Sequence, residues 1–136
     1  MNRPSNTFLT NRSIPQCTVI PVLGYEDVDK AVDWLCNAFG FTVRLRIANH
    51  RVQLFVGDGA VVVNEGRRLA ETNHSIMVRV EDVDRHHEHA REHGTTILHP
   101  PTSYPYGERQ YSAEDLGGHR WTFSQSIADV DPDEFL

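Results

Sequence analysis

Histidines crowd one short segment of the chain, and their spacing is the first feature that could carry chemistry. They are His86, His87, His89 and His93, and residues 89–93 read H-A-R-E-H. Two histidines four residues apart on a helix can share a zinc ion, and the H-x-x-E-H order is typical of inverted zincins. Motifs this short also recur by chance, so we favour a solvated helix face that binds at most an adventitious transition metal.

Other catalytic arrangements are not evident in the sequence. The glycines at residues 57–59 and 117–118 match hairpin turns, because neither segment leads into a helix whose N-terminus would hold a phosphate. No serine lies in a nucleophile elbow. Cys17 and Cys36 lack C-x-x-C spacing, which favours two separate thiols over a disulfide or a metal pair.

An internal repeat indicates which elements position these residues. The tetrapeptide Glu-Asp-Val-Asp occurs at residues 26–29 and again at residues 81–84. An apolar, β-branched run of strand type precedes each copy. After each copy, apolar residues follow at helical spacing until Gly40 or Gly94 ends the pattern. Each copy therefore marks the passage from a strand into a helix.

Three further strands follow each predicted helix. The predicted strands are residues 17–23, 42–47, 51–56 and 60–65 in the first unit, and 75–80, 95–99, 108–113 and 119–124 in the second. Neither unit is large enough to close its own sheet. We therefore predict an α+β fold in which two tandem βαβββ modules form a curved, mostly antiparallel eight-stranded sheet around a cleft, with the helices outside.

The chain of 136 residues has the length of one ordinary domain. Its predicted parts are an N-terminal extension (1–16), module one (17–65), a linker (66–73), module two (74–125) and an acidic C-terminal tail (126–136), with residues 17–125 forming the single domain. Both ends are polar and are expected to lie outside the sheet.

Several motifs resemble one known family. They are F-G-F at residues 39–41, V-E-D-V-D at residues 80–84, Y-G-E-R-Q-Y at residues 106–111 and D-L-G-G-H-R-W-T-F at residues 115–123. The sequence resembles the vicinal oxygen chelate superfamily, which includes glyoxalase I, extradiol dioxygenases, fosfomycin-resistance enzymes and bleomycin-binding resistance proteins. The last motif is most similar to the glyoxalase-like, bleomycin-resistance-like branch, with Leu116 in place of a common proline.

The resemblance implies where a metal would be bound. In metal-dependent members a divalent cation sits in the cleft on one side chain from the first and one from the last strand of each module. The corresponding positions here are Ile20, Val63, Ser75 and Thr122. Divalent cations need carboxylate or imidazole donors, so this set predicts no metal and no other cofactor. A divalent cation held by non-standard ligands is the alternative.

Glu65 is the acidic residue closest to these positions. It is two residues beyond Val63, so the alternation of strand side chains places both on one face, whereas His74 should point away from Ser75. We hypothesise that Glu65 lines the cleft, and a solvated residue at a strand end is the equally weighted alternative.

The cleft lining can be predicted from the same alternation. The proposed residues are Ile20, Val22, Val63, Glu65, Ser75, Met77, Tyr106, Arg109, Tyr111 and Thr122, with Arg120 and Ser124 on the last strand. Apolar and polar side chains are mixed, as in most small-molecule sites. Tyrosines could stack on a planar ligand while Arg109 pairs with an anionic group or with Glu65; alternatively, Arg109 pairs with Asp115 and the tyrosines pack the sheet.

Charge and composition restrict the partners. The net charge is −6 and no basic stripe is present, so nucleic acid and membrane surfaces are not expected partners. No apolar run resembles a signal peptide, which predicts a cytoplasmic protein. Two functions remain: a metal-independent, homodimeric protein that binds a small organic molecule such as an antibiotic, or a metal-dependent glyoxalase-type isomerase or lyase or a dioxygenase using Glu65. Whether the chain is an enzyme stays open.

Overall fold

The computed structural model describes residues 8–48 and 50–134, which form two βαβββ modules. Module one contains β1 (Val22–Tyr25), α1 (Val28–Phe39), β2 (Thr42–Ile47), β3 (Arg51–Val56) and β4 (Gly59–Glu65). Module two contains β5 (Ile76–Arg79), α2 (Val83–Glu92), β6 (Thr96–Ser103), β7 (Glu108–Glu114) and β8 (Arg120–Ser126), and a short 3-10 helix (Pro132–Glu134) follows. The predicted α+β fold of two tandem modules is confirmed.

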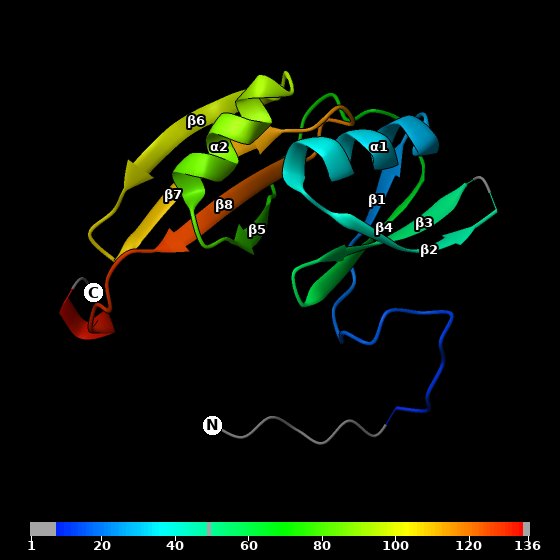
Figure 1. Ribbon diagram of the computed structural model, residues 1–136, viewed down its shortest axis with the longest axis horizontal. Helices are drawn as coiled ribbons and strands as arrows, with labels where there is room; N and C mark the ends of the chain where they lie inside the picture. The colour runs from blue at the N-terminus through cyan, green and yellow to red at the C-terminus, as the bar shows by residue number, and fades with distance from the viewer. Residues whose placement is uncertain (1–7, 49, 135–136) are drawn as a thin grey trace.

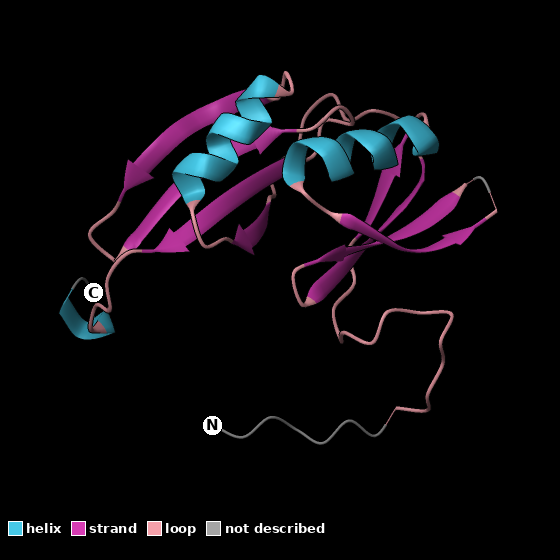
Figure 2. Cartoon of the chain, in the orientation of Figure 1, coloured by secondary structure: helices cyan, strands magenta, loops and turns pink. Residues whose placement is uncertain are grey.

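The strands form two four-stranded mixed sheets. Sheet 1 has the order β1-β4-β3-β2, and sheet 2 has the equivalent order β5-β8-β7-β6. The first strand of each module runs parallel to the last, and all other neighbours are antiparallel. Hydrogen bonds therefore join four strands at a time, rather than all eight as expected. Figures 1 and 2 show the two sheets with α1 and α2 on the same side of both.

The repeated tetrapeptide forms the start of both helices. The side chain of Asp27 accepts a hydrogen bond from the backbone N–H of Lys30, and Asp82 accepts one from Arg85 in the same way. These aspartates satisfy N–H groups that the first helical turn leaves without a partner. Gly40 ends α1 with a φ of 80°, a conformation that favours glycine. Within the described residues, no helix is long and apolar enough to span a membrane.

The core lies between the helices and the sheets. Phe39, at the end of α1, contacts Trp121 and Phe123 of β8, with ring centroids 5.8 and 4.9 Å apart. Aromatic residues thus fill the junction between the two modules. Because side chains alternate along a strand, each sheet has a helix face, which packs against the helices, and an open face on the opposite side.

A buried carboxylate joins the two modules. Asp115 accepts hydrogen bonds from the Tyr25 hydroxyl at 2.6 Å and from Nε1 of Trp121 at 2.9 Å. Its second oxygen accepts hydrogen bonds from the backbone N–H groups of Gly117 and His119. Burial, together with the charge of Asp115, raises the pKa of Tyr25, so its hydroxyl stays protonated and donates. Four donors therefore compensate the buried carboxylate.

Two strands differ from the sequence-based expectation by four residues or more at one end. The predicted strand 17–23 begins only at Val22, because the preceding residues leave the sheet. The predicted strand 95–99 continues to Ser103 through Pro100 and Pro101. Prolines are tolerated there because β6 is an edge strand, and shifts in its pairing on either side of His99 leave both prolines without a partner on β7.

Residues 8–20 form an irregular segment, here called the strap, that lies on the open face of sheet 1. Nη2 of Arg44 donates to the carbonyl oxygen of Arg12 at 3.2 Å, and Nε2 of Gln53 donates to that of Ser13 at 2.8 Å. Figure 1 shows the strap in blue on the side of sheet 1 away from α1. Much of the predicted N-terminal extension therefore contacts the domain, while residues 1–7 lie outside the described residues.

The C-terminal segment lies against the loop between β6 and β7. The backbone N–H groups of Ile127 and Ala128 both donate to the carbonyl oxygen of Gly107. A Cβ atom at Gly107 would lie 2.5 Å from the carbonyl oxygen of Ala128, so a side chain at this position would displace the segment. The first residues of the predicted acidic tail thus pack on module two, and residues 135–136 lie outside the described residues.

Candidate functional site

Polar side chains lie at the centre of the open face of sheet 2. The open-face residues there are Met77 of β5, Gln110 and Ser112 of β7, and Thr122 and Ser124 of β8. The side chain of Met77 is 59% exposed, so an apolar surface lies beside these polar side chains. We call these residues the open-face cluster.

Hydrogen bonds between side chains fix the cluster. Nε2 of Gln110 donates to Oγ of Ser124 at 3.0 Å, and Oγ of Ser124 donates to Oε1 of Glu108 at 2.7 Å. The hydroxyls of Ser112 and Thr122 lie 3.0 Å apart and form a hydrogen bond in which either can donate. Each of these side chains is therefore oriented by a neighbour before any ligand arrives.

Glu108 gives this face a negative end. Hydrogen bonds from Ser126 and Ser124, together with the nearby positive charge of Arg79, lower the pKa of Glu108. Nη2 of Arg79 in turn donates to Oγ of Ser126 at 3.2 Å. The carboxylate is thus ionised at neutral pH and can accept a hydrogen bond from a ligand donor.

Several predicted cleft residues lie on or near the open faces. Val22 and Met77 are exposed on the first strand of each sheet, and Thr122 belongs to the open-face cluster. Ser75 is exposed directly before β5. Ile20 lines a pocket formed by the strap. Val22 belongs to sheet 1, whereas Met77 and Thr122 belong to sheet 2, so these positions do not share one sheet.

Val63 and Tyr111 lie elsewhere, fully buried in the core on the helix faces. For Val63, the reason is a difference in turn length. Two residues (57–58) join β3 to β4, whereas five residues (115–119) join β7 to β8. Four residues after Gly59 the chain reaches Val63 on the helix face, whereas four residues after Gly118 it reaches Thr122 on the open face. Val62, which pairs with Val22 as Thr122 pairs with Met77, is therefore the sheet 1 equivalent of Thr122.

Glu65 and Arg109 do not face the open-face cluster. Glu65 is exposed at the end of β4 and lies on the same face of this strand as the buried Val63. Arg109 shares a face with Tyr111, as expected, but this is the helix face: its Nη2 lies 3.0 Å from Oδ1 of Asp84 in α2. Arg109 therefore makes an ion pair with neither of the predicted partners, Glu65 and Asp115.

Tyr106 borders the open face. Its ring stacks on Tyr104 with centroids 5.3 Å apart, and its hydroxyl donates to Oε1 of Gln110 at 3.3 Å. Tyr106 is thereby linked to the open-face cluster. A planar ligand on this face would lie near the stacked rings.

Tyr111 is part of a buried chain of polar groups at the junction of the helices. Nδ1 of His86 lies 2.5 Å from the Tyr111 hydroxyl, and Nε2 lies 3.2 Å from the carbonyl oxygen of Phe39. The carbonyl can only accept, so Nε2 carries the proton and the hydroxyl donates to Nδ1. Burial lowers the pKa of His86 and raises that of Tyr111, which keeps both groups neutral.

The residues at the family's metal positions do not fit a divalent cation. Ile20, Ser75 and Thr122, together with Val62 as the structural equivalent on β4, supply neither carboxylate nor imidazole. Within residues 8–48 and 50–134, no group of three or more His, Cys, Asp or Glu side chains could hold a metal.

The H-x-x-E-H histidines have other partners. Nε2 of His89 lies 2.7 Å from the carbonyl oxygen of Asn37 in α1, and Nδ1 of His93 lies 2.8 Å from the carbonyl oxygen of His89 itself. These contacts tie α2 to α1 and close the end of α2. The zincin interpretation therefore finds no support in the geometry.

Sequence reasoning missed Glu108, Gln110 and Ser112. The alternation of apolar and polar residues in β7 could have identified them. Tyr111 and Ala113 are the apolar residues of this strand, and the apolar side of a half-buried strand faces the core. Its polar residues then lie on the open face of the sheet. The strap left no such signal, because its position depends on contacts with Arg44 and Gln53 far along the chain.

The fold and the open-faced sheets place this chain in a known class of two-module βαβββ proteins. The sequence model of the Glyoxalase/Bleomycin resistance protein/Dioxygenase superfamily matches residues 14–123, and the chain belongs to this superfamily. The predicted resemblance to the vicinal oxygen chelate family is thereby confirmed. The chain is also similar to TioX from Micromonospora sp. ML1, a solved structure with 32% identity and a TM-score of 0.70 that covers 85% of this chain and 100% of that chain.

More distant solved structures share the fold. FosX, a genomically encoded fosfomycin resistance protein from Listeria monocytogenes, has 16% identity and a TM-score of 0.70, covering 90% of this chain and 100% of that one. A glyoxalase/bleomycin resistance protein/dioxygenase from Alicyclobacillus acidocaldarius has 15% identity and a TM-score of 0.67, covering 85% and 95% respectively. No curated protein sequence is similar enough to match the chain.

Proposed function

We propose that this protein binds a small organic molecule on the open face of sheet 2, without a metal at the family's ligand positions. The observation that carries the proposal is the open-face cluster, whose polar groups are oriented by one another beside the exposed side chain of Met77. Preorganised polar groups on a partly apolar surface are typical of small-molecule sites.

The open-face cluster and its neighbours Glu108 and Tyr106 favour a particular ligand chemistry. The ionised Glu108 accepts hydrogen bonds, and the side chains of Ser112 and Thr122 can both donate and accept. The side chain of Met77 and the ring of Tyr106 suit an apolar or aromatic surface. A planar molecule with at least one N–H or O–H donor, such as an aromatic antibiotic, meets all of these requirements.

We further propose that the functional unit is a homodimer in which a second copy covers part of the open faces. Val22, Phe55 and Met77 are large apolar side chains exposed on these faces, with Phe55 43% exposed. Apolar side chains gathered on one side of a small protein favour association. Light scattering coupled to size-exclusion chromatography checks the mass, and an exclusively monomeric protein at micromolar concentration would contradict the dimer.

A thermal-shift screen against aromatic and glycopeptide antibiotics tests the ligand proposal. A ligand at a hundred times its dissociation constant stabilises the folded state by about 2.7 kcal/mol, which such a screen detects. We expect Met77→Asp to abolish the shift, because it places an uncompensated charge in the apolar part of the site. Val43→Asp is the matched control, since Val43 is similarly exposed at 44% but lies on β2 of the other sheet.

Two outcomes would contradict the proposal. One is an identical shift in both variants for every ligand found, which would place the ligand away from the open-face cluster. The other is a stoichiometric metal in the purified protein that is required for binding and is lost on Glu65→Ala, which would restore the metal-dependent alternative.

A further inference from the structure

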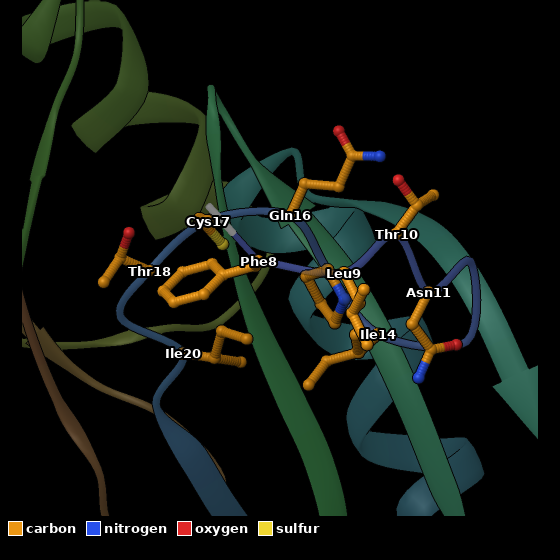
Figure 3. A pocket seen from close by; sticks show the side chains of 10 residues that line it. Phe8, Leu9, Thr10, Asn11, Ile14, Gln16, Cys17, Thr18 and Ile20 are labelled. Carbon is orange, nitrogen blue, oxygen red and sulfur yellow. The ribbon is translucent and has the colours of Figure 1, made fainter. Parts of the chain in front are cut away.

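A cavity lies away from the open-face cluster, within the strap. It has a volume of 390 Å³, and the ten described residues that line it all belong to the strap. Figure 3 shows Phe8 beside Cys17, Thr18 and Ile20, with Ile14 on the neighbouring part of the loop. We call this cavity the strap pocket.

Sheet 1 holds the strap in the shape that creates the pocket. Nη1 of Arg44 donates to Oε1 of Gln53 at 2.6 Å, while Nη2 of Arg44 and Nε2 of Gln53 donate to the carbonyl oxygens of Arg12 and Ser13. Gln53 is only 3% exposed, although its side chain lies on the open face of the sheet. The strap therefore buries a polar side chain whose oxygen and nitrogen both have partners.

The strap is also folded within itself. The backbone N–H of Ile14 donates to the carbonyl oxygen of Asn11 at 3.4 Å, and the side chain of Asn11 accepts from the N–H of Ser13 at 3.0 Å. Pro15 follows this turn and is buried. A turn anchored at Arg12 and Ser13 thus shapes the loop whose inner side lines the cavity.

We propose that the strap pocket binds an uncharged small molecule that carries both apolar and polar groups, at a site distinct from the open face of sheet 2. The volume lies within the range of small-molecule sites. None of the ten described lining residues is charged, and Phe8, Ile14 and Ile20 are among its apolar side chains. Thr18 and Asn11 offer hydrogen bonds without charge. The inference does not rest on the proposed function, because the open-face cluster shares no residue with this pocket.

Nile red, an uncharged dye that fluoresces in apolar surroundings, is a suitable probe for titration of the full chain. We expect Ile14→Asp to weaken Nile red binding at least tenfold, because it places a charge in an uncharged pocket. Arg44→Ala should also weaken binding, since it removes one of the two side chains that hold the strap. Val43→Asp and Met77→Asp should bind the dye as the original protein does. Circular dichroism and thermal unfolding establish that each variant is folded.

The two cysteines provide a second measurement that needs no substitution. Cys17 lines the strap pocket, whereas Cys36 lies in α1 and serves as the internal control. Alkylation by N-ethylmaleimide, followed by mass spectrometry of the peptides, gives the rate at each thiol. We expect saturating Nile red to slow the alkylation of Cys17 at least fivefold and to leave the rate at Cys36 unchanged.

Four results would contradict ligand binding in the strap pocket. Unchanged alkylation of Cys17 at saturating dye would overturn the proposal, as would equal dye affinity in Ile14→Asp and Val43→Asp. Loss of dye binding in Met77→Asp alone would place the dye on the open face of sheet 2, which contradicts the strap pocket while leaving the proposed function intact. Absence of any dye binding to the original protein would also count against it.

Discussion

Replacing Tyr25 by Phe tests how strongly the two modules are joined. The substitution keeps the ring and removes the hydroxyl that donates to Oδ2 of the buried Asp115 at 2.6 Å. Hydrogen bonds to charged groups contribute about 1.5–3 kcal/mol. Oδ2 keeps a second donor, Nε1 of Trp121 at 2.9 Å. We therefore expect the free energy of unfolding to fall by about 1.5–2 kcal/mol, at the lower end of that range.

Urea denaturation followed by tryptophan fluorescence measures this change. Trp121 lies beside the altered group, so its emission reports on the transition. In a domain of this size, a loss of 1 kcal/mol lowers the melting temperature by about 3–5 °C, so the expected shift is about 5–10 °C. Tyr106→Phe is the matched control, because it removes an exposed hydroxyl with a longer bond of 3.3 Å to Gln110. The control should change stability by about 0.5 kcal/mol or less.

A double-mutant cycle separates the hydrogen bond from other effects of the substitution. If Tyr25 acts through Asp115, the effect of Tyr25→Phe should nearly vanish in an Asp115→Ala background. Equal losses in both backgrounds would refute the reasoning. So would a loss in Tyr25→Phe that is no larger than the loss in Tyr106→Phe.

Three further predictions concern single residues. Burial lowers the pKa of His86, so the unfolded state binds this proton more readily than the folded state does. The free energy of unfolding should therefore fall as the pH drops below about 6.5, and His86→Gln should reduce the difference between the values from urea denaturation at pH 5.5 and 7.5; an unchanged difference would contradict the assignment. Gly117→Ala places a Cβ 2.6 Å from the buried ring of Tyr25 and should lower the free energy of unfolding by about 1–3 kcal/mol in urea denaturation; unchanged stability would contradict this close packing. Arg109→Ala removes a partly exposed ion pair with Asp84 and should change stability by less than about 1 kcal/mol; an altered ligand shift in the thermal screen would show that its assignment to the helix face is wrong.

Local signals made the module plan predictable. The repeated Glu-Asp-Val-Asp placed both helix starts correctly, because an N-cap aspartate acts on a backbone N–H only three residues away. The buried Val28 and Val83 follow directly from the same repeat. Short-range chemistry of this kind is fully contained in the sequence.

The candidate site was less predictable, because its faces depend on turn lengths and on distant contacts. The assignment of Val63 to the cleft failed by one residue, since the two modules enter their last strands from turns of different length. Asp115 and Tyr25 are 90 residues apart in the sequence, so no local sequence pattern predicts their hydrogen bond. The burial of Gln53 under the strap has the same long-range origin.

The prolines of β6 also affect how this protein can meet other chains. A strand at the edge of a sheet normally offers free N–H and C=O groups, on which a further strand can add and begin an aggregate. Pro100 and Pro101 carry no N–H, and they stand in the middle of the outer strand of sheet 2. This border is therefore a poor template for fibrous polymerisation, which protects a protein whose sheets are each left uncovered by helices on one side.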